Sequence, residues 1–268
     1  MLFNIVKKLL IPAIILSQYG CASQESHGLT VVASTTLIGT ILEEIGEDRV
    51  KVSTILPGGI CPGHFDLKPS DMRAFSGAHM IFYQGWEPWI NGLLDSEDAR
   101  DSEKLSIFTE GNLMVPPLHI EAAREIAEIL RGKDPENSAY YTENLERYIK
   151  EIRDSKREIL GRAESFKGVR VVSSRHQKAL LAWLGFEVVA TYKRADDMSP
   201  SDYASVIRIA REKNARAVID NLQSGPEDGK IIAEETGIPQ AALSNFPIDG
   251  SYISTLRNNF AKLETIIK

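Results

Sequence analysis

One long helical pattern runs from residue 137 to residue 166. It contains no proline and a single glycine, Gly161, and apolar residues recur in it at helical spacing, among them Leu145, Ile149 and Ile152. Charged residues fill most of the other positions, as on a helix with one buried face. A helix of this length is well above the mean for globular proteins. We therefore expect one long helix that joins the parts of the chain before and after it.

Short β-rich runs alternate with helical patterns on both sides of this stretch. Alternation of this kind predicts parallel sheets whose faces are covered by helices. The strand-like runs are residues 30–33, 50–56, 79–83, 105–108, 169–173, 186–191, 217–219 and 240–243. We predict an α/β fold of two Rossmann-like lobes with mostly parallel sheets, joined by the long helix. Ligands of such sheets bind beyond the carboxyl ends of the strands, so the ligand cleft is expected between the lobes.

The N-terminus indicates the compartment in which the chain works. Lys7 and Lys8 precede a short apolar run, and Gly20 and Cys21 follow it; this is the pattern of a secretory signal. A cysteine at this point suggests a lipoprotein with the lipid on Cys21, and the alternatives are a signal anchor or a signal cleaved elsewhere. We expect a signal peptide at 1–20, an N-terminal lobe at 21–136, the linking helix at 137–167 and a C-terminal lobe at 168–268. No other segment is long and apolar enough to span a membrane.

The processed chain is acidic and has one cysteine left. Loss of Lys7 and Lys8 leaves 29 basic and 37 acidic residues, which changes the net charge from −6 to −8. An acidic balance argues against nucleic acid as a partner. Cys61 alone cannot form an intrachain disulfide, so the stability of the fold must come from its hydrophobic core.

Three of the five histidines lie in short, unusual segments that are far apart in the sequence. His64 is in PGGICPGHFDLKPSD, His119 is in MVPPLHIEAA and His176 is in VVSSRHQKALLAWLGF. Imidazole is the commonest metal ligand, and three imidazoles with an open or weakly filled fourth position suit a divalent ion. Such a site is assembled by the fold from distant segments and not by one local loop, as in a capture-and-release protein or a zinc enzyme. The other two, His27 and His79, are expected to lie in a polar N-terminal stretch and in a buried strand.

Five stretches with characteristic order and spacing carry a family resemblance. They are Leu56-Pro57 with Pro62-Gly63-His64 and Pro69-Ser70-Asp71; Gly85-Trp86-Glu87-Pro88-Trp89; Val115-Pro116-Pro117-Leu118-His119; Ser173-Ser174-Arg175-His176; and Ser251-Tyr252 through Asn258. Together they resemble the zinc and manganese lipoproteins that serve as solute receptors of ABC transporters, with two lobes joined by one rigid helix. The resemblance covers essentially the whole processed chain.

The resemblance implies a function, a location and partners. The chain is expected to be an extracytoplasmic receptor, anchored to the cell membrane through lipid on Cys21. It would capture a divalent transition metal and deliver it to an ABC permease and its ATPase. We expect it to be a monomer and not an enzyme. The three neutral ligands His64, His119 and His176 carry over from the family pattern.

The anionic fourth ligand of the family pattern does not carry over. Asn245 stands where an aspartate is usual after the last strand, and Asn221 stands near a position where a glutamate is common. Cys61, three residues before His64, could complete a His3Cys tetrahedron and supply the charge as a thiolate. The alternatives are that Cys61 packs as a small hydrophobic residue, and that Asn245 gives a carbonyl oxygen or holds a water.

Zinc is the favoured metal, with Mn2+ and Fe2+ as alternatives. The third predicted ligand is a histidine, and borderline ions prefer nitrogen and sulfur, whereas manganese prefers oxygen and more charge. A zinc-dependent hydrolytic enzyme is the second class of function, but the sequence has no His-Glu-x-x-His or similar general-base motif. A receptor for a metal chelate on the same scaffold is the third, because a fold does not fix its ligand.

Overall fold

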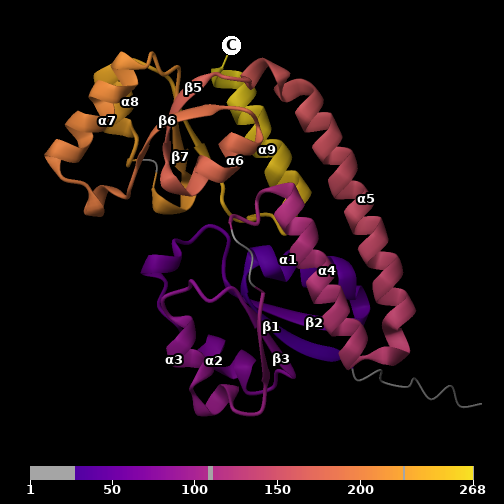
Figure 1. The fold of residues 1–268 in the computed structure, drawn as a ribbon. Helices are drawn as coiled ribbons and strands as arrows, with labels where there is room; N and C mark the ends of the chain where they lie inside the picture. The colour runs from indigo at the N-terminus through magenta and orange to yellow at the C-terminus, as the bar shows by residue number, and fades with distance from the viewer. Residues whose placement is uncertain (1–27, 108–110, 226, 268) are drawn as a thin grey trace, which may run out of the picture.

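Two four-stranded sheets, each with only parallel strand pairs, form the framework of the computed structural model, which describes residues 28–107, 111–225 and 227–267 (Figure 1). The first sheet has the order β2-β1-β3-β4 and the second the order β6-β5-β7-β8. The strands are β1 (Leu29–Thr35), β2 (Val50–Leu56), β3 (Met80–Tyr83), β4 (Glu103–Ser106), β5 (Arg170–Ser174), β6 (Glu187–Tyr192), β7 (Val218–Asn221) and β8 (Gln240–Leu243). Both sheets therefore place their first strand between their second and third, which confirms the predicted two-lobed α/β fold.

The helices connect the strands and cover both faces of each sheet, as parallel strands require. They are α1 (Thr36–Gly46), α2 (Pro69–Phe75), α3 (Ile90–Leu94), α4 (Pro116–Lys133), α5 (Ser138–Arg162), α6 (Lys178–Trp183), α7 (Pro200–Glu212), α8 (Lys230–Thr236) and α9 (Tyr252–Ile266). Among the described helices, none combines the length and the hydropathy needed to cross a bilayer. The predicted signal peptide, Cys21 and His27 lie outside the described residues.

Successive side chains of the central strands belong to different cores, as the two-residue period of a strand dictates. In β1, Val31 and Ala33 join the core on the side of α1, whereas Val32 joins the core beneath α2 and α3. In β5, Val171 and Val172 are divided in the same way. Apolar side chains on both faces explain why these strands read as continuous hydrophobic runs in the sequence.

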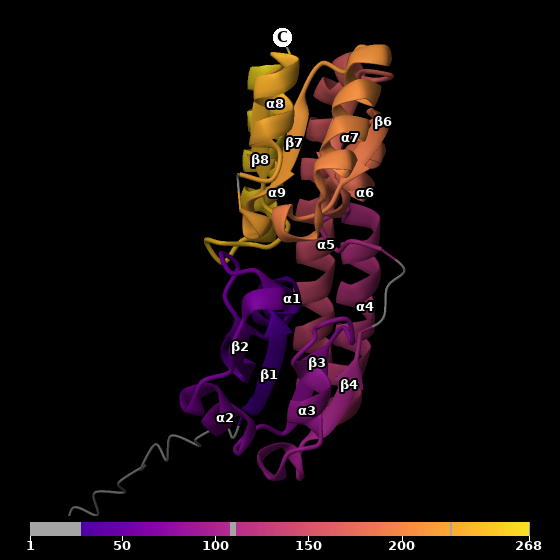
Figure 2. The same ribbon diagram turned by 90° about the vertical axis from the view of Figure 1, so that its left-hand side faces the viewer.

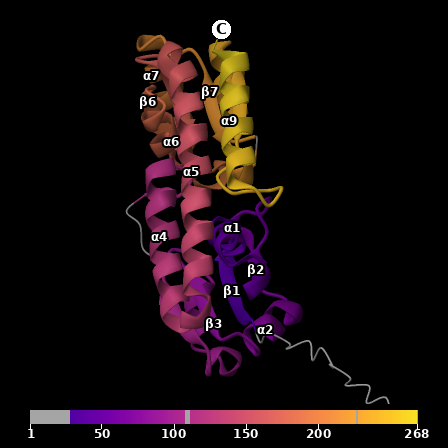
Figure 3. The same ribbon diagram turned by 90° about the vertical axis from the view of Figure 1, so that its right-hand side faces the viewer.

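Helix α5 runs beside both lobes and joins them (Figure 3). It covers most of the predicted 137–166 stretch and ends in a short 3-10 turn at Ala163–Phe166. Its buried face includes Tyr148, Ile152 and Ile159, and one continuous core contains these residues together with residues of both sheets. The helix is therefore packed along its length, as a stiff strut would be.

The strut leads to a prediction on lobe movement. Because α5 has no internal proline and its apolar stripe is buried beside both lobes, the lobes should tilt only slightly when ligand binds. Small-angle X-ray scattering with and without a saturating ligand should give radii of gyration that agree within error. A clear decrease on loading would contradict a rigid strut.

Candidate functional site

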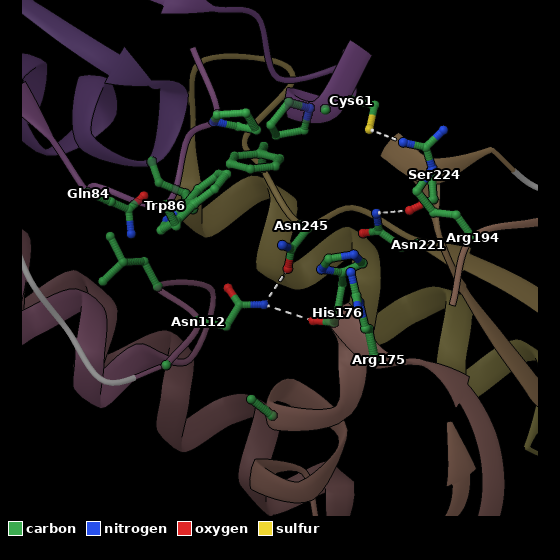
Figure 4. Close-up of a pocket in the computed structure, with 18 of the residues that line it drawn as sticks. Cys61, Gln84, Trp86, Asn112, Arg175, His176, Arg194, Asn221, Ser224 and Asn245 are labelled. Carbon is green, nitrogen blue, oxygen red and sulfur yellow. Dashed lines mark hydrogen bonds between the residues drawn. The ribbon is translucent and has the colours of Figure 1, made fainter. Parts of the chain in front are cut away.

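A cavity of about 590 Å³ lies between the two lobes, and segments that follow all eight described strands contribute to it (Figure 4). From the first lobe it is lined by Leu37, Cys61, Pro62, Gly63, Gln84, Trp86, Pro88, Gly111, Asn112 and Leu113. From the second lobe it is lined by Arg175, His176, Ala179, Arg194, Asp197, Asn221, Ser224, Asn245 and Phe246. The carboxyl ends of both parallel sheets thus meet at this cavity, which is where such sheets bind ligands.

His176 lies in a 3-10 turn directly after β5 and is half-buried at the cavity. Burial lowers the pKa of His176, and the neighbouring guanidinium groups of Arg175 and Arg194 lower it further. The imidazole is therefore neutral at pH 7, which is the form that binds a metal. Among the three predicted histidine ligands, only His176 lines the cavity itself.

An asparagine pair joins the lobes beside His176. The Nδ2 atom of Asn112, from the loop before α4, donates to the backbone oxygen of His176 at 3.1 Å and also to Oδ1 of Asn245. The Oδ1 atom of Asn112 accepts from the backbone N–H of Met114 at 2.8 Å. Asn245 therefore lies at the cavity, but its carbonyl oxygen already accepts a hydrogen bond.

Cys61 and His64 lie on the first lobe in the loop after β2, and Arg194 reaches them from the second lobe. Nη1 of Arg194 is 3.5 Å from Sγ of Cys61. Nη2 lies 2.8 Å from Nε2 and 3.1 Å from Nδ1 of His64, which is exposed. A guanidinium group thus contacts both of the predicted ligands from this loop. Sequence reasoning missed Arg194, because no recognised motif contains it and only the fold brings it to this loop.

His119 takes a structural position instead of a place in the cavity. It is completely buried, its Nδ1 is 3.1 Å from the backbone oxygen of Leu113, and its Nε2 is 2.8 Å from the hydroxyl of Tyr148. The ring stacks on Tyr252 with centroids 3.6 Å apart. Burial lowers its pKa to about 3. The sequence suggested a ligand loop here, but α4 has already begun at Pro116, and its first turns direct His119 into the core between α5 and α9.

The structure therefore does not bring the three predicted histidines together. Within the residues that it describes, no group of three or more His, Cys, Asp or Glu side chains is placed to hold a metal ion. The predicted site residues that share the cavity are Cys61, His176 and Asn245, with His64 beside them through Arg194. Cys61, His64 and His176 lie in segments that the sequence singled out by their histidines.

The acidic residues near the cavity have other roles. Glu87 is buried, and its Oε1 accepts from the Ser34 hydroxyl and from the backbone N–H of Gln84. Asp220 is also buried and accepts from the Tyr192 hydroxyl. Asp220 faces away from its neighbour Asn221, as expected for adjacent residues of a strand. Asp197 is the only carboxylate among the described residues that line the cavity.

Comparison with known proteins identifies the family. Residues 31–266 match the family described as zinc-uptake complex component A, periplasmic (ZnuA). The chain belongs to the ZnuA family. ZnuA-family proteins are substrate-binding components of metal ABC transporters, act outside the cytoplasm at the membrane, and are not enzymes. These statements confirm the resemblance inferred from the five sequence stretches and exclude the hydrolytic enzyme.

Individual relatives are distant in sequence but cover most of the chain. The metal ABC transporter substrate-binding lipoprotein SloC of Streptococcus mutans is 22% identical in an alignment of 270 positions that covers 87% of this chain and 87% of SloC. The manganese-binding lipoprotein MntA of Halalkalibacterium halodurans is 24% identical and aligns with 81% of this chain and 78% of its own. The fold of FpvC from Pseudomonas aeruginosa, solved with Mn2+, matches with a TM-score of 0.79 at 17% identity, covering 90% of this chain and 98% of FpvC. The family is thus fixed, whereas the metal is not.

Proposed function

We propose that the chain captures zinc outside the cytoplasm and delivers it to an ABC permease and its ATPase, held at the membrane by lipid on Cys21. The observation that carries this proposal is that a thiol of one lobe and an imidazole of the other line the same cavity, with a second imidazole beside it. Cys61 and His64 come from the first lobe and His176 from the second. Nitrogen and sulfur donors without carboxylates favour zinc over manganese. Several relatives are named as manganese binders, so Mn2+ and Fe2+ are the competing cargoes.

The proposed metal donors are Cys61, His64 and His176, with Asn245 at the fourth position. His119 no longer belongs to this set, because both of its ring nitrogens are engaged in the core. The loops after β2 and β5 would have to move for the donors to share one ion, because the described side chains form no ready group of three metal donors. The lipoprotein names of the relatives support the lipid anchor, and we propose that the receptor is a monomer.

Cobalt substitution tests the role of Cys61. Cobalt replaces zinc in sulfur-containing sites, and we expect the loaded protein to show a sulfur-to-cobalt charge-transfer band that Cys61→Ser removes. The same substitution should weaken zinc binding at least about tenfold. Elemental analysis of untagged protein should find one zinc per chain. His79→Gln is the matched control, since His79 accepts from the backbone N–H of Thr30 away from the cavity. An unchanged cobalt spectrum in Cys61→Ser would show that the thiol is not a ligand.

A further inference from the structure

The guanidinium group of Arg194 places a positive charge on the proposed metal donors. Only 17% of its side chain is exposed, and its ion-pair partner within the described part of the chain, Asp196 at 3.2 Å, is 77% exposed. An exposed carboxylate compensates a partly buried charge weakly. The Nε atom of Arg194 is buried and has no hydrogen-bond partner within the described part of the chain. A bare divalent cation that approached Cys61 and His64 would therefore meet a like charge at hydrogen-bond distance.

The side-chain oxygens of the asparagines at the cavity already accept hydrogen bonds. The orientation of Asn112 is fixed, because its Oδ1 accepts from a backbone N–H and its Nδ2 donates to a backbone carbonyl. The atom of Asn245 that faces this Nδ2 must therefore be its oxygen. Asn221 behaves likewise, since its Oδ1 accepts from Gln177 at 3.0 Å, and the same nitrogen of Gln177 donates to the backbone oxygen of Leu243. These amides offer few acceptor oxygens to a cation.

Among the described residues that line the cavity, two guanidinium groups stand against one carboxylate. Arg175 lines the cavity together with Arg194, and Asp197 is the only carboxylate among the described lining residues. A ligand that brings acceptor oxygens and negative charge of its own would match this lining, because guanidinium groups bind carboxylates through paired hydrogen bonds.

The size of the cavity agrees with a ligand larger than an ion. Its volume of about 590 Å³ falls in the range of small-molecule pockets, about 300–1,000 Å³. Zinc–ligand bonds are only about 2.0–2.3 Å long, so a bare ion cannot contact the walls of such a space at once. A metal ion wrapped in a small organic molecule fills more of it.

We propose that the cleft binds its metal as an anionic chelate, in which a polycarboxylate small molecule holds the ion. Arg194 and Arg175 bind the carboxylates of the chelator, and Cys61, His64 or His176 complete the coordination of the metal. This inference rests on the proposed function, which supplies the metal as cargo. The carboxylates of the chelator then supply the negative charge that Asn245, which stands where an aspartate is usual, does not provide.

Calorimetric titration of the full chain in mild detergent tests the proposal with three probes: zinc chloride, sodium citrate and the 1:1 zinc–citrate complex. Zinc citrate should bind at least about tenfold more tightly than either component. Arg194→Gln and Arg175→Gln should each reduce the affinity for zinc citrate about tenfold, the loss expected for a charge-assisted hydrogen bond. Arg194→Lys should keep only part of the affinity, since lysine retains the positive charge but cannot form the paired hydrogen bonds of a guanidinium group. Arg208→Gln is the control, because Arg208 pairs with Glu212 on α7.

The outcomes separate this inference from the proposed function. If zinc chloride binds more tightly than zinc citrate and the arginine variants bind it as well as the parent does, the chelate proposal is wrong and the zinc receptor stands. If citrate alone binds as tightly as zinc citrate, the cleft holds an anion and the metal cargo is wrong. If no probe binds to protein that melts normally, both proposals fail for this metal and this chelator class.

Discussion

Replacement of His119 by alanine is expected to lower the free energy of unfolding by about 4 kcal/mol. The substitution removes a fully buried ring that stacks on Tyr252 and leaves a void, and truncations of buried rings cost about 3–5 kcal/mol. It also leaves the hydroxyl of Tyr148 and the backbone oxygen of Leu113 without their partner. Urea unfolding followed by circular dichroism measures the loss. A change below about 1 kcal/mol would contradict the structural role given to His119.

The same loss should depend on pH. The folded protein holds the pKa of His119 at about 3 because the ring is buried, against an ordinary value of 6.5. Below pH 6.5 the unfolded chain therefore takes up a proton that the folded chain refuses, so the wild type loses stability as the pH falls from 6.5 towards 3. The slope is at most about 1.4 kcal/mol per pH unit. His119→Ala lacks this group, so the difference between the two proteins should shrink over this range.

A conservative substitution separates structure from ligation at the same position. His119→Phe keeps an aromatic ring against Tyr252 but provides no ring nitrogen. We expect it to bind zinc or zinc citrate with the affinity of the wild type. A loss of binding comparable to that of Cys61→Ser would restore His119 to the ligand set that the sequence suggested.

Replacement of Gly58 by valine is expected to weaken ligand binding at least about tenfold. Gly58 lies in the loop after β2, where a side chain would meet the backbone oxygen of Pro247 at 1.8 Å. Its own oxygen accepts from Gln223 of the second lobe at 2.7 Å. Valine would force the loops of the two lobes apart, and donors such as Cys61 and His176 would no longer approach one another. Calorimetric titration with zinc and with zinc citrate measures the effect.

The neighbouring glycine provides the control for this substitution. A side chain at Gly59 would have no atom within 4 Å, so Gly59→Val should bind both probes as the wild type does. Equal losses in the two variants would mean that loop flexibility matters, and not the close approach between the lobes.

The fold was predictable because its signals are local or periodic. The proline-free stretch that forms α5 and the apolar runs that form β1 and β5 can be read directly from side-chain spacing. Element boundaries were less accurate: the run predicted at 105–108 forms a strand at Glu103–Ser106 instead. The exposed and half-exposed residues of β4 carry little hydrophobic signal, so pairing with β3 decides where this strand lies.

The cavity was predictable only in part, because its charge comes from residues that are far apart in the sequence and meet only in the fold. Cys61 and His176 were identified from residue type and from the loops that hold them, and Asn245 from the family resemblance. Arg194 lies more than a hundred residues from Cys61 in sequence, and only the closure of the two lobes brings them to 3.5 Å. His119 was expected in a loop at the cavity. In the structure α4 already begins at Pro116, so His119 lies in a helix and its ring is buried in the core.

The continuous core along α5 makes the two lobes one cooperative unit. The same cluster of buried residues contains Val31 of the first sheet, Ile152 of α5 and Phe260 of α9. Neither lobe can lose its packing without exposing apolar surface of the other, so the chain should melt in one transition and not as two domains in succession. A ligand that binds only the folded form raises the stability of the whole unit in proportion to the logarithm of its concentration over its dissociation constant. Cargo held between the lobes therefore protects even the far ends of the molecule, and the melting temperature should keep rising with ligand concentration after the site is full.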